Sequence, residues 1–414
     1  MERPSLWLST AVVVLLGLLF LQQPWLRRYD EVFLHWLIKN AAVPNKAVPL
    51  MIVEIGNADS RKQPTTSELE TVLQTGGSVN SPLECALLVQ AALDFQPAVI
   101  GFEPVLQWPE QAKEQEQIFV DQAMRVPELL LAAELTATPD PDAPVADVSG
   151  FPHVTGKRGN LVEFSGVARQ PSEDVRLLSK LGFINLPGDA SDEVRAPLLF
   201  QYRGEVVPSF ALEAVLLWLR VPHEEVRIAI GDAIELPQGR KIPIEADGTI
   251  VVNRNAANLA RRLTSNELLL AAQQREQGKP PPGFNDLANS ILLARPAADA
   301  AQQGDIFAAA IATIQAQAFV RRANWIFDCA ILAAISLVAG AMGRLPRLDL
   351  ILLAISCSAA YCLVALGVLS RWSIWLPGLL PLLVLWVAVV LALVLPRRSA
   401  GAEPAAVVAS PPLP

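Results

Sequence analysis

The stretch that decides the fold of the polar part of the chain is PLECALLVQAALDFQPAVIGFEPV, residues 82–105. Apolar side chains recur at helical spacing over residues 82–96, and residues 97–105 have the short apolar pattern of a buried strand. A similar strand pattern, VPLMIVEIG at residues 48–56, precedes them. Strand, helix and strand in this order predict a βαβ unit with parallel pairing and a right-handed crossover.

The sequence that follows extends this unit into a single α/β domain. A turn at Arg203-Gly204 leads into a helix with Ser209 as its N-cap, because the serine hydroxyl accepts an orphan backbone N–H. ANSILLARP, residues 288–296, predicts a return strand. Further helix and strand patterns lie at residues 114–124, 127–135, 193–202 and 226–253. The expected fold class is α/β, a mixed-sheet sandwich.

Four apolar runs lie outside this domain. The chain has 414 residues, of which 52% are hydrophobic and 18% charged, a composition between those of a soluble domain and a transporter. A helix needs about 20 apolar residues to cross the hydrocarbon of a bilayer. Runs close to that length occur at about residues 6–21, 325–342, 348–369 and 374–395. The expected architecture is therefore one α/β domain plus four transmembrane helices.

The predicted organisation follows from these runs. Residues 1–26 form an N-terminal anchor, since no small-x-small cleavage site marks the first run as a removable signal peptide; a cleaved signal is the alternative. The other segments are an extracytoplasmic sensor at 27–323, three transmembrane helices at 324–396 and a short Ala/Pro-rich disordered tail at 397–414.

Basic residues in short loops set the expected orientation. Arg344 and Arg347 lie between the second and third runs, and Arg397 and Arg398 follow the fourth. Positive residues in short loops stay in the cytoplasm, so both termini are expected there and the large domain outside, in a bacterial inner membrane. The arginines at 27, 28, 321 and 322 oppose this orientation, but long translocated domains largely escape the rule.

The last helical pattern of the domain, at residues 305–319, has no breaker between it and the second apolar run. One unbroken helix is therefore expected over residues 305–343, joining domain and bilayer as either a rigid relay or a passive tether. Its candidate relay residues are Ile306, Ile311, Ile314, Arg321, Arg322 and Trp325.

Sequence motifs for catalysis are absent. The chain has no Walker loop, Cys-x-x-Cys pair or Gly-x-Ser-x-Gly elbow, and His35, His153 and His223 lie on separate segments. We therefore expect no enzyme, no metal site and no cofactor. The net charge of −8 and pI near 5.1 also argue against nucleic acid as a partner.

The expected ligand site lies at the carboxyl ends of the strands, where open α/β sheets bind ligands. Glu54 and Glu103 end two predicted adjacent parallel strands, and Asp59 lies just beyond Glu54. Alternatively, Glu54 is a solvated edge residue, Glu103 caps a loop, and Asn185 and Arg195 make structural hydrogen bonds. The candidate ligand-binding residues are Glu54, Asn57, Asp59, Glu103, Asn185 and Arg195.

Local motifs add a family resemblance. YDEVFLHWLI (29–38) carries an aspartate, and VPLMIVEIGNADS (48–60) ends a strand with Asp59 and Ser60. The longest motif, LGFINLPGDASDEVRAPLLFQYRGEVVPSFALEAV (181–215), includes Gly182, and IPIEADGTIVVN (242–253) forms a hairpin pattern. Together these motifs and the layout over residues 29–395 resemble the type-two CHASE class, the CHASE2-like bacterial extracytoplasmic sensory domains.

The resemblance implies an exported sensor held between one N-terminal span and several C-terminal spans, followed in that family by a cytoplasmic kinase or cyclase. Here only RRSAGAEPAAVVASPPLP follows the fourth run, so a sensor of this kind is expected to act through a separate kinase or cyclase, or through a homo-oligomer. Its other expected partners are the lipid bilayer and an unknown extracytoplasmic signal or protein.

Two functions are therefore expected from the sequence. The first is a membrane-anchored extracytoplasmic sensory protein that relays a signal to a partner. The alternative is a structural or scaffold subunit of a bacterial envelope complex. A sensor requires a concave pocket near the strand ends, whereas a scaffold requires an exposed apolar patch.

Overall fold

The computed structural model describes residues 24–41, 47–56, 81–138, 148–186, 194–279, 284, 287–296, 306–342 and 346–394. The chain divides into two compact units. We call residues 34–321 with 368–375 the α/β unit, and the remaining residues, up to 33, 322–367 and from 376 onward, the helical unit. The first predicted transmembrane run lies outside the described residues.

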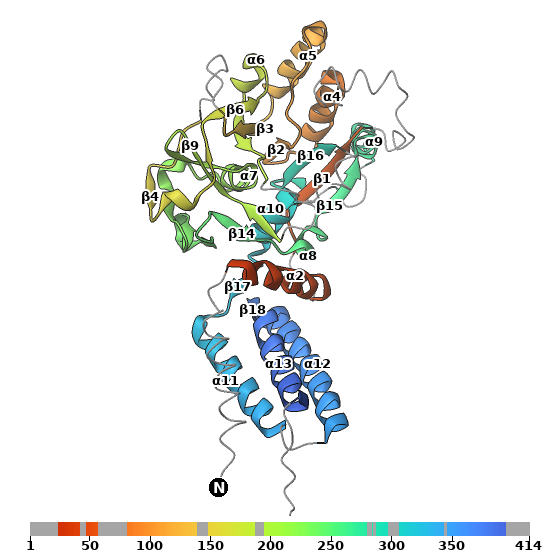
Figure 1. Ribbon diagram of the computed structural model, residues 1–414. Helices are drawn as coiled ribbons and strands as arrows, with labels where there is room; N and C mark the ends of the chain where they lie inside the picture. The colour runs from red at the N-terminus through yellow and green to blue at the C-terminus, as the bar shows by residue number, and fades with distance from the viewer. Residues whose placement is uncertain are drawn as a thin grey trace, which may run out of the picture. The chain divides into compact units, whose positions relative to one another are not determined.

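The α/β unit is built on a seven-stranded sheet (Figure 1). Its strands follow the order β15-β1-β16-β2-β3-β6, and β7 also pairs with β3. The pairing of β3 with β6 is antiparallel and the other pairings are parallel, so the sheet is mixed, as expected. The strands are β1 (Leu50–Ile55), β2 (Val99–Phe102), β3 (Leu129–Thr136), β6 (Gly166–Arg169), β7 (Lys180–Phe183), β15 (Arg261–Thr264) and β16 (Ile291–Pro296).

The predicted βαβ unit is wrong in one respect. β1, the helix α4 (Pro82–Leu93) and β2 form where expected, and the two strands are parallel, but they are not neighbours. The predicted return strand β16 pairs with both, matching Leu293 with Ile52 on one side and with Gly101 on the other. The residues of β16 up to Ala294 are apolar and fully buried, which suits a strand in the middle of a parallel sheet.

Helices cover both faces of this sheet, as the two-residue period of its strands requires. Leu50 and Ile52 of β1 belong to a core shared with α7 (Phe210–Leu219) and α10 (Ile306–Ala316). Met51 and Val53 belong to a second core, shared with three helices on the other face. Those helices are α4, α5 (Lys113–Ala123) and α9 (Ser265–Glu276).

Smaller sheets contain the strands predicted after residue 193, but the hairpin predicted at residues 242–253 is wrong, because its two strands pair with other strands in different sheets. The predicted turn at Arg203-Gly204 joins β9 to β10, and Ser209 caps α7 by accepting from the backbone N–H of Leu212 at 3.4 Å. A three-stranded sheet contains β10 (Glu205–Pro208), β9 (Leu199–Tyr202) and β5 (Glu163–Phe164). The others contain β13 (Lys241–Pro243), β12 (Ala233–Glu235), β11 (Arg227–Ala229) and β4 (His153–Thr155), then β14 (Thr249–Val251) with β8 (Arg195–Pro197).

The expected unbroken helix over residues 305–343 is wrong. Ile306, Ile311 and Ile314 are buried in α10, as predicted, but the helix ends at Ala316. Gln317 then takes a left-handed conformation, with a φ of 54°, and the N–H of Ala318 bonds to the Thr313 carbonyl. Such a left-handed residue ends a helix in the same way as a C-terminal glycine. Arg321 and Arg322 form the short strand β17, and a new helix, α11 (Trp325–Met342), begins at Trp325.

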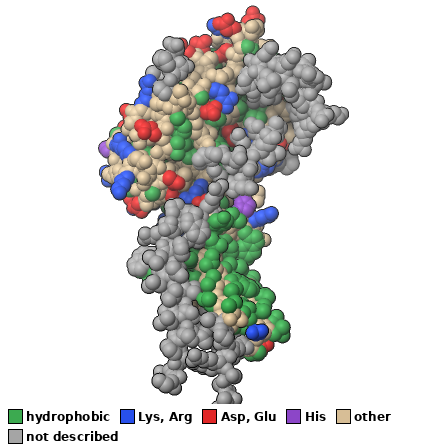
Figure 2. All heavy atoms as spheres, in the orientation of Figure 1, with side chains coloured by type: hydrophobic (Ala, Val, Ile, Leu, Met, Phe, Trp, Pro, Cys, Tyr) green, Lys and Arg blue, Asp and Glu red, His purple; other side chains and the backbone are tan. Residues whose placement is uncertain are grey.

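The helical unit contains α11, α12 (Arg347–Trp372) up to residue 367, and α13 (Leu379–Val394). Among the described residues, α12 is the helix long and apolar enough to cross a membrane, while α11 and α13 are apolar but fall short of that length. Only 11% of the apolar window of α12 is buried, which is unlike the core helix of a soluble protein. Figure 2 shows hydrophobic side chains over this part of the surface. Exposed apolar side chains of α12 include Leu348, Leu352, Ile355, Leu363 and Val364.

The helix α2 (Pro24–Asn40) contributes residues to both units. Within the helical unit, the buried carboxylate of Asp30 accepts from the backbone N–H groups of Gly378 and Leu379, at 3.1 and 2.9 Å, and so satisfies the N-terminus of α13. Within the α/β unit, the Asn255 amide donates to the carbonyls of Ile38 and Ala41, at 2.6 and 3.1 Å. Both parts of α2 therefore make hydrogen bonds with elements remote in the sequence.

Candidate functional site

The carboxyl edge of the sheet holds two of the predicted site residues. Glu54 is matched in register with Arg295 of β16, and Glu103 follows β2, the other neighbour of β16. Glu103 Oε2 lies 3.9 Å from Arg295 Nε, and the arginine side chain is only 1% exposed. A buried guanidinium needs a nearby carboxylate to offset its lost hydration. Glu103 thus has a structural role at this edge.

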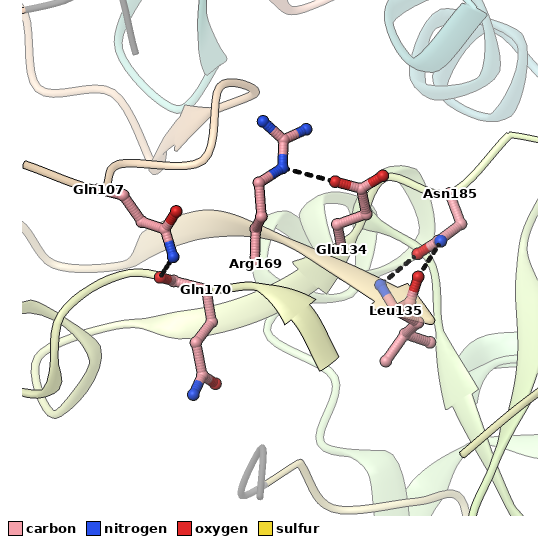
Figure 3. Close-up of polar contacts among 6 residues, drawn as sticks. All are labelled: Gln107, Glu134, Leu135, Arg169, Gln170 and Asn185. Atoms are coloured by element: carbon pink, nitrogen blue, oxygen red, sulfur yellow. Dashed lines mark hydrogen bonds and ion pairs between the residues drawn. The ribbon is translucent and has the colours of Figure 1, made fainter. Parts of the chain in front are cut away.

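Asn185 lies beside the ends of β3 and β7, where its side-chain amide binds one backbone residue (Figure 3). Its Oδ1 accepts from the N–H of Leu135 and its Nδ2 donates to the carbonyl of Leu135, both at 2.8 Å. Close by in Figure 3, Arg169 of β6 pairs with Glu134 of β3 at 2.6 Å. These contacts fasten strands together and occupy the polar groups that a ligand would use.

The other predicted ligand residues are not brought to this edge among the described residues. Arg195 begins β8 in the separate two-stranded sheet and lies 3.8 Å from Glu245. Asn57 and Asp59 lie outside the described residues. A ligand role for the six predicted residues therefore stays a prediction, and a cavity lies elsewhere on the α/β unit.

A pocket of about 600 Å³ opens at the opposite edge, beside the amino ends of β3 and β7. We call it the amino-edge pocket. Glu128 precedes β3, Lys180 begins β7, α7 contributes Glu213, and Arg220 is the C-cap of the same helix. Its volume lies within the usual range for sites that hold small molecules.

A histidine and a buried carboxylate form the fixed polar part of this pocket. Glu213 of α7 is only 4% exposed, and its Oε2 lies 2.8 Å from His223 Nε2. The other ring nitrogen, Nδ1, lies 3.0 Å from the carbonyl of Ser149, which orients the imidazole. The ring of Phe151 packs against it with centroids 4.6 Å apart. The pair is preorganised, because both ring nitrogens have fixed partners.

The electrostatics of the pair favour a charged imidazole. Burial lowers the pKa of His223, but the hydrogen bond and charge of Glu213 and the carbonyl of Ser149 outweigh burial and raise the pKa above its usual 6.5. The carboxylate of Glu224 acts in the same direction. The folded protein therefore binds this proton more tightly than the unfolded chain does.

This difference predicts a pH-dependent stability. The contribution of the pair is fully present below pH 6.5 and is lost as pH rises through the higher folded-state pKa of His223. Chemical unfolding of the full chain in detergent should show a lower free energy of unfolding at about pH 8 than at about pH 6. In His223→Gln this slope should flatten, with a loss of about 1–3 kcal/mol at the lower pH from the charged hydrogen bond. An unchanged slope in the variant would contradict this role.

Sequence reasoning missed this site. His223 lies on a separate segment from the other two histidines, so the sequence indicates no partner for it. One signal was available, since Glu213 lies in FALEAVLLWL among apolar residues that form the buried stripe of the helix. A carboxylate at a core position requires a buried partner. The partner comes from a later loop, which no periodicity could identify.

Comparison with known proteins gives one match. The family model described as CHASE2 domain matches residues 9–341, well over half of the 414 residues. The match includes the whole sheet and the residues of the amino-edge pocket. No curated protein and no solved structure matches the chain.

Proposed function

The chain belongs to the CHASE2 domain family, a class of extracytoplasmic sensory domains, and on that premise we propose that it is a membrane-anchored sensory protein. The α/β unit binds its signal outside the cytoplasm, and the state of that unit passes through the membrane helices to a separate protein. The chain itself has no catalytic activity in this proposal.

The amino-edge pocket is the observation that carries the proposal. A sensor needs a concave site with polar groups in fixed positions, and the pocket supplies both through its volume and the Glu213–His223 pair. A scaffold subunit needs no such site. The pocket therefore favours the sensory function over the structural one.

Membrane insertion of several helices is part of the proposal. The exposed apolar side chains of α12 support it, because an apolar helix that is not buried by protein requires another apolar environment. We propose that α11 and α13 cross the bilayer together with α12, and that an N-terminal anchor precedes α2. Both termini then lie in the cytoplasm of a bacterial cell, and the α/β unit lies on the extracytoplasmic side of the inner membrane.

We propose that α2 carries the signal, in place of the helix first expected from the sequence. Asp30 fastens its first half to the N-terminus of α13, and Asn255 fastens its last turn within the α/β unit. We therefore expect a movement of α8 (Arg254–Ala257), which carries Asn255, to displace α2. The interruption after Ala316 leaves α10 less suited to this task.

Cysteine labelling with a membrane-impermeant reagent tests the topology. In a chain with Cys329, Cys357 and Cys362 replaced by serine, Lys157→Cys should be labelled in intact spheroplasts; Ser399→Cys should require permeabilised ones. Lys157 is exposed, and the remaining Cys85 is buried. Labelling of Lys157→Cys only after permeabilisation would overturn the proposal.

The full chain, carrying an affinity tag and purified in detergent, should bring a kinase or cyclase with it. Asp30→Ala should keep that partner but lose transmission, because the backbone donors of Gly378 and Leu379 lose their acceptor, whereas Asp30→Asn retains an acceptor oxygen and should transmit. If Asp30→Ala transmitted the signal as well as Asp30→Asn does, α2 would be excluded as the relay.

A further inference from the structure

Three cationic side chains line the amino-edge pocket. Arg176 comes from α6 (Glu173–Arg176), Lys180 from β7 and Arg220 from the end of α7. Within the described part of the chain, none of these three side chains forms an ion pair or hydrogen bond. Three elements separated in the sequence thus deliver unpaired positive charge to one cavity, as a site for a carboxylate requires.

Arg220 also occupies a position where arginine is unfavourable. It follows α7 with φ 55° and ψ 43°, the left-handed conformation that glycine adopts most easily. A glycine here would end the helix at lower cost to the backbone. The arginine instead places a guanidinium at the pocket, where a glycine would bring no charge.

Unpaired carboxylates line the same cavity. Glu128 and Glu224 face it without an ion pair or hydrogen bond from any described residue, whereas Glu213 is committed to His223. The cations and these two carboxylates share a lining but do not pair with one another. A purely anionic ligand would neutralise the cations and leave Glu128 without a positive partner and Glu224 with only the charge of His223.

Apolar side chains complete the pocket. Leu217 and Val221 lie in its lining, and Leu177 is 76% exposed beside them. An exposed leucine at the mouth of a pocket gains by covering an apolar ligand group. The site therefore combines positive, negative and apolar recognition.

We propose that the amino-edge pocket binds a zwitterionic amino acid or short peptide with an apolar side chain. The carboxylate lies against Arg176, Lys180 and Arg220, and the ammonium group lies toward Glu224 and Glu128. This assignment rests on the proposed sensory function and names the chemistry of its signal.

Matched probes test the assignment by calorimetry on the full chain in detergent. Leucine and the dipeptide Leu-Leu carry both charges, 4-methylpentanoate lacks the ammonium group, and isoamylamine lacks the carboxylate. At least one of the zwitterions should bind, and more tightly than either single-charge analogue. Equal or tighter binding of 4-methylpentanoate, preferential binding of inorganic phosphate, or no binding of the zwitterions at millimolar concentration would overturn the assignment.

Variants locate the bound ligand. Arg220→Gly should weaken zwitterion binding by about tenfold to a hundredfold, the effect of losing a charged hydrogen-bond partner, while its Tm stays equal or rises. Arg203→Gly is the control, because Arg203 also has a left-handed φ, 52°, but does not line the pocket. Glu224→Gln should weaken leucine binding and leave that of 4-methylpentanoate unchanged. An affinity unaffected by Arg220→Gly would exclude this pocket.

The proposed function can fail independently of this assignment. Extracytoplasmic labelling and a co-purified kinase or cyclase, combined with no binding of the zwitterions, would leave the sensor intact and refute the ligand class. Zwitterion binding by a chain whose α/β unit is labelled from the cytoplasmic side would support the ligand class and refute the extracytoplasmic sensor.

Discussion

Gly182→Val should destabilise the α/β unit by about 3 kcal/mol or more, a large part of the total stability of a typical domain. Gly182 lies in β7, where α7 approaches the strand. A Cβ at this position would lie 2.6 Å from the Cα of Phe210 and 3.2 Å from its Cβ. Backbone atoms of a packed helix cannot move aside as a flexible side chain can, so strand and helix must separate. Urea unfolding of the detergent-solubilised chain measures the loss.

Gly159→Val is the matched control for this variant. Gly159 receives the same side chain at an exposed position, where an added Cβ meets nothing within 4 Å. Its free energy of unfolding should stay within about 0.5 kcal/mol of the parent value. If both variants unfolded at the same urea concentration as the parent, the close packing of α7 on β7 would be wrong.

The elements of this fold are largely readable from local patterns. β1, α4 and β2 formed where their periodicity placed them, and Ser209 caps α7 as expected. The position of β16 was not readable, since parallel pairing between strands remote in the sequence depends on the whole sheet. The end of α10 was also missed, because Gln317 ends the helix without a glycine or proline.

The candidate site was less predictable for a related reason. Sequence reasoning placed the site at the carboxyl ends of the strands. There Glu103 lies beside the buried Arg295, and Asn185 binds the backbone of Leu135. The amino-edge pocket depends on His223 meeting Glu213 and on three cations from separate elements. Each of these residues looks ordinary in its own segment, and only the tertiary fold brings them together.

The carboxyl edge gives the second large prediction. Glu103→Leu should cost about 3–5 kcal/mol, because it removes a carboxylate beside the buried guanidinium of Arg295. Replacing both residues, as Glu103→Leu with Arg295→Met, should recover most of that loss, since buried pairs are often replaceable by apolar side chains of similar volume. Thermal and urea unfolding of the parent, the single variant and the double variant measure the coupling between the two residues.

An exposed ion pair serves as the control. Glu134 and Arg169 are 35% and 46% exposed, so Glu134→Gln should cost less than about 1 kcal/mol despite the shorter 2.6 Å contact.

The Glu103 and Arg295 variants also distinguish the two edges of the sheet. If the carboxyl edge is structural, the double variant regains stability and binds zwitterions as the parent does. A double variant that folds normally but loses the ligand would return the binding site to Glu103 and its neighbours, because only a residue in contact with the ligand would change affinity while stability is restored.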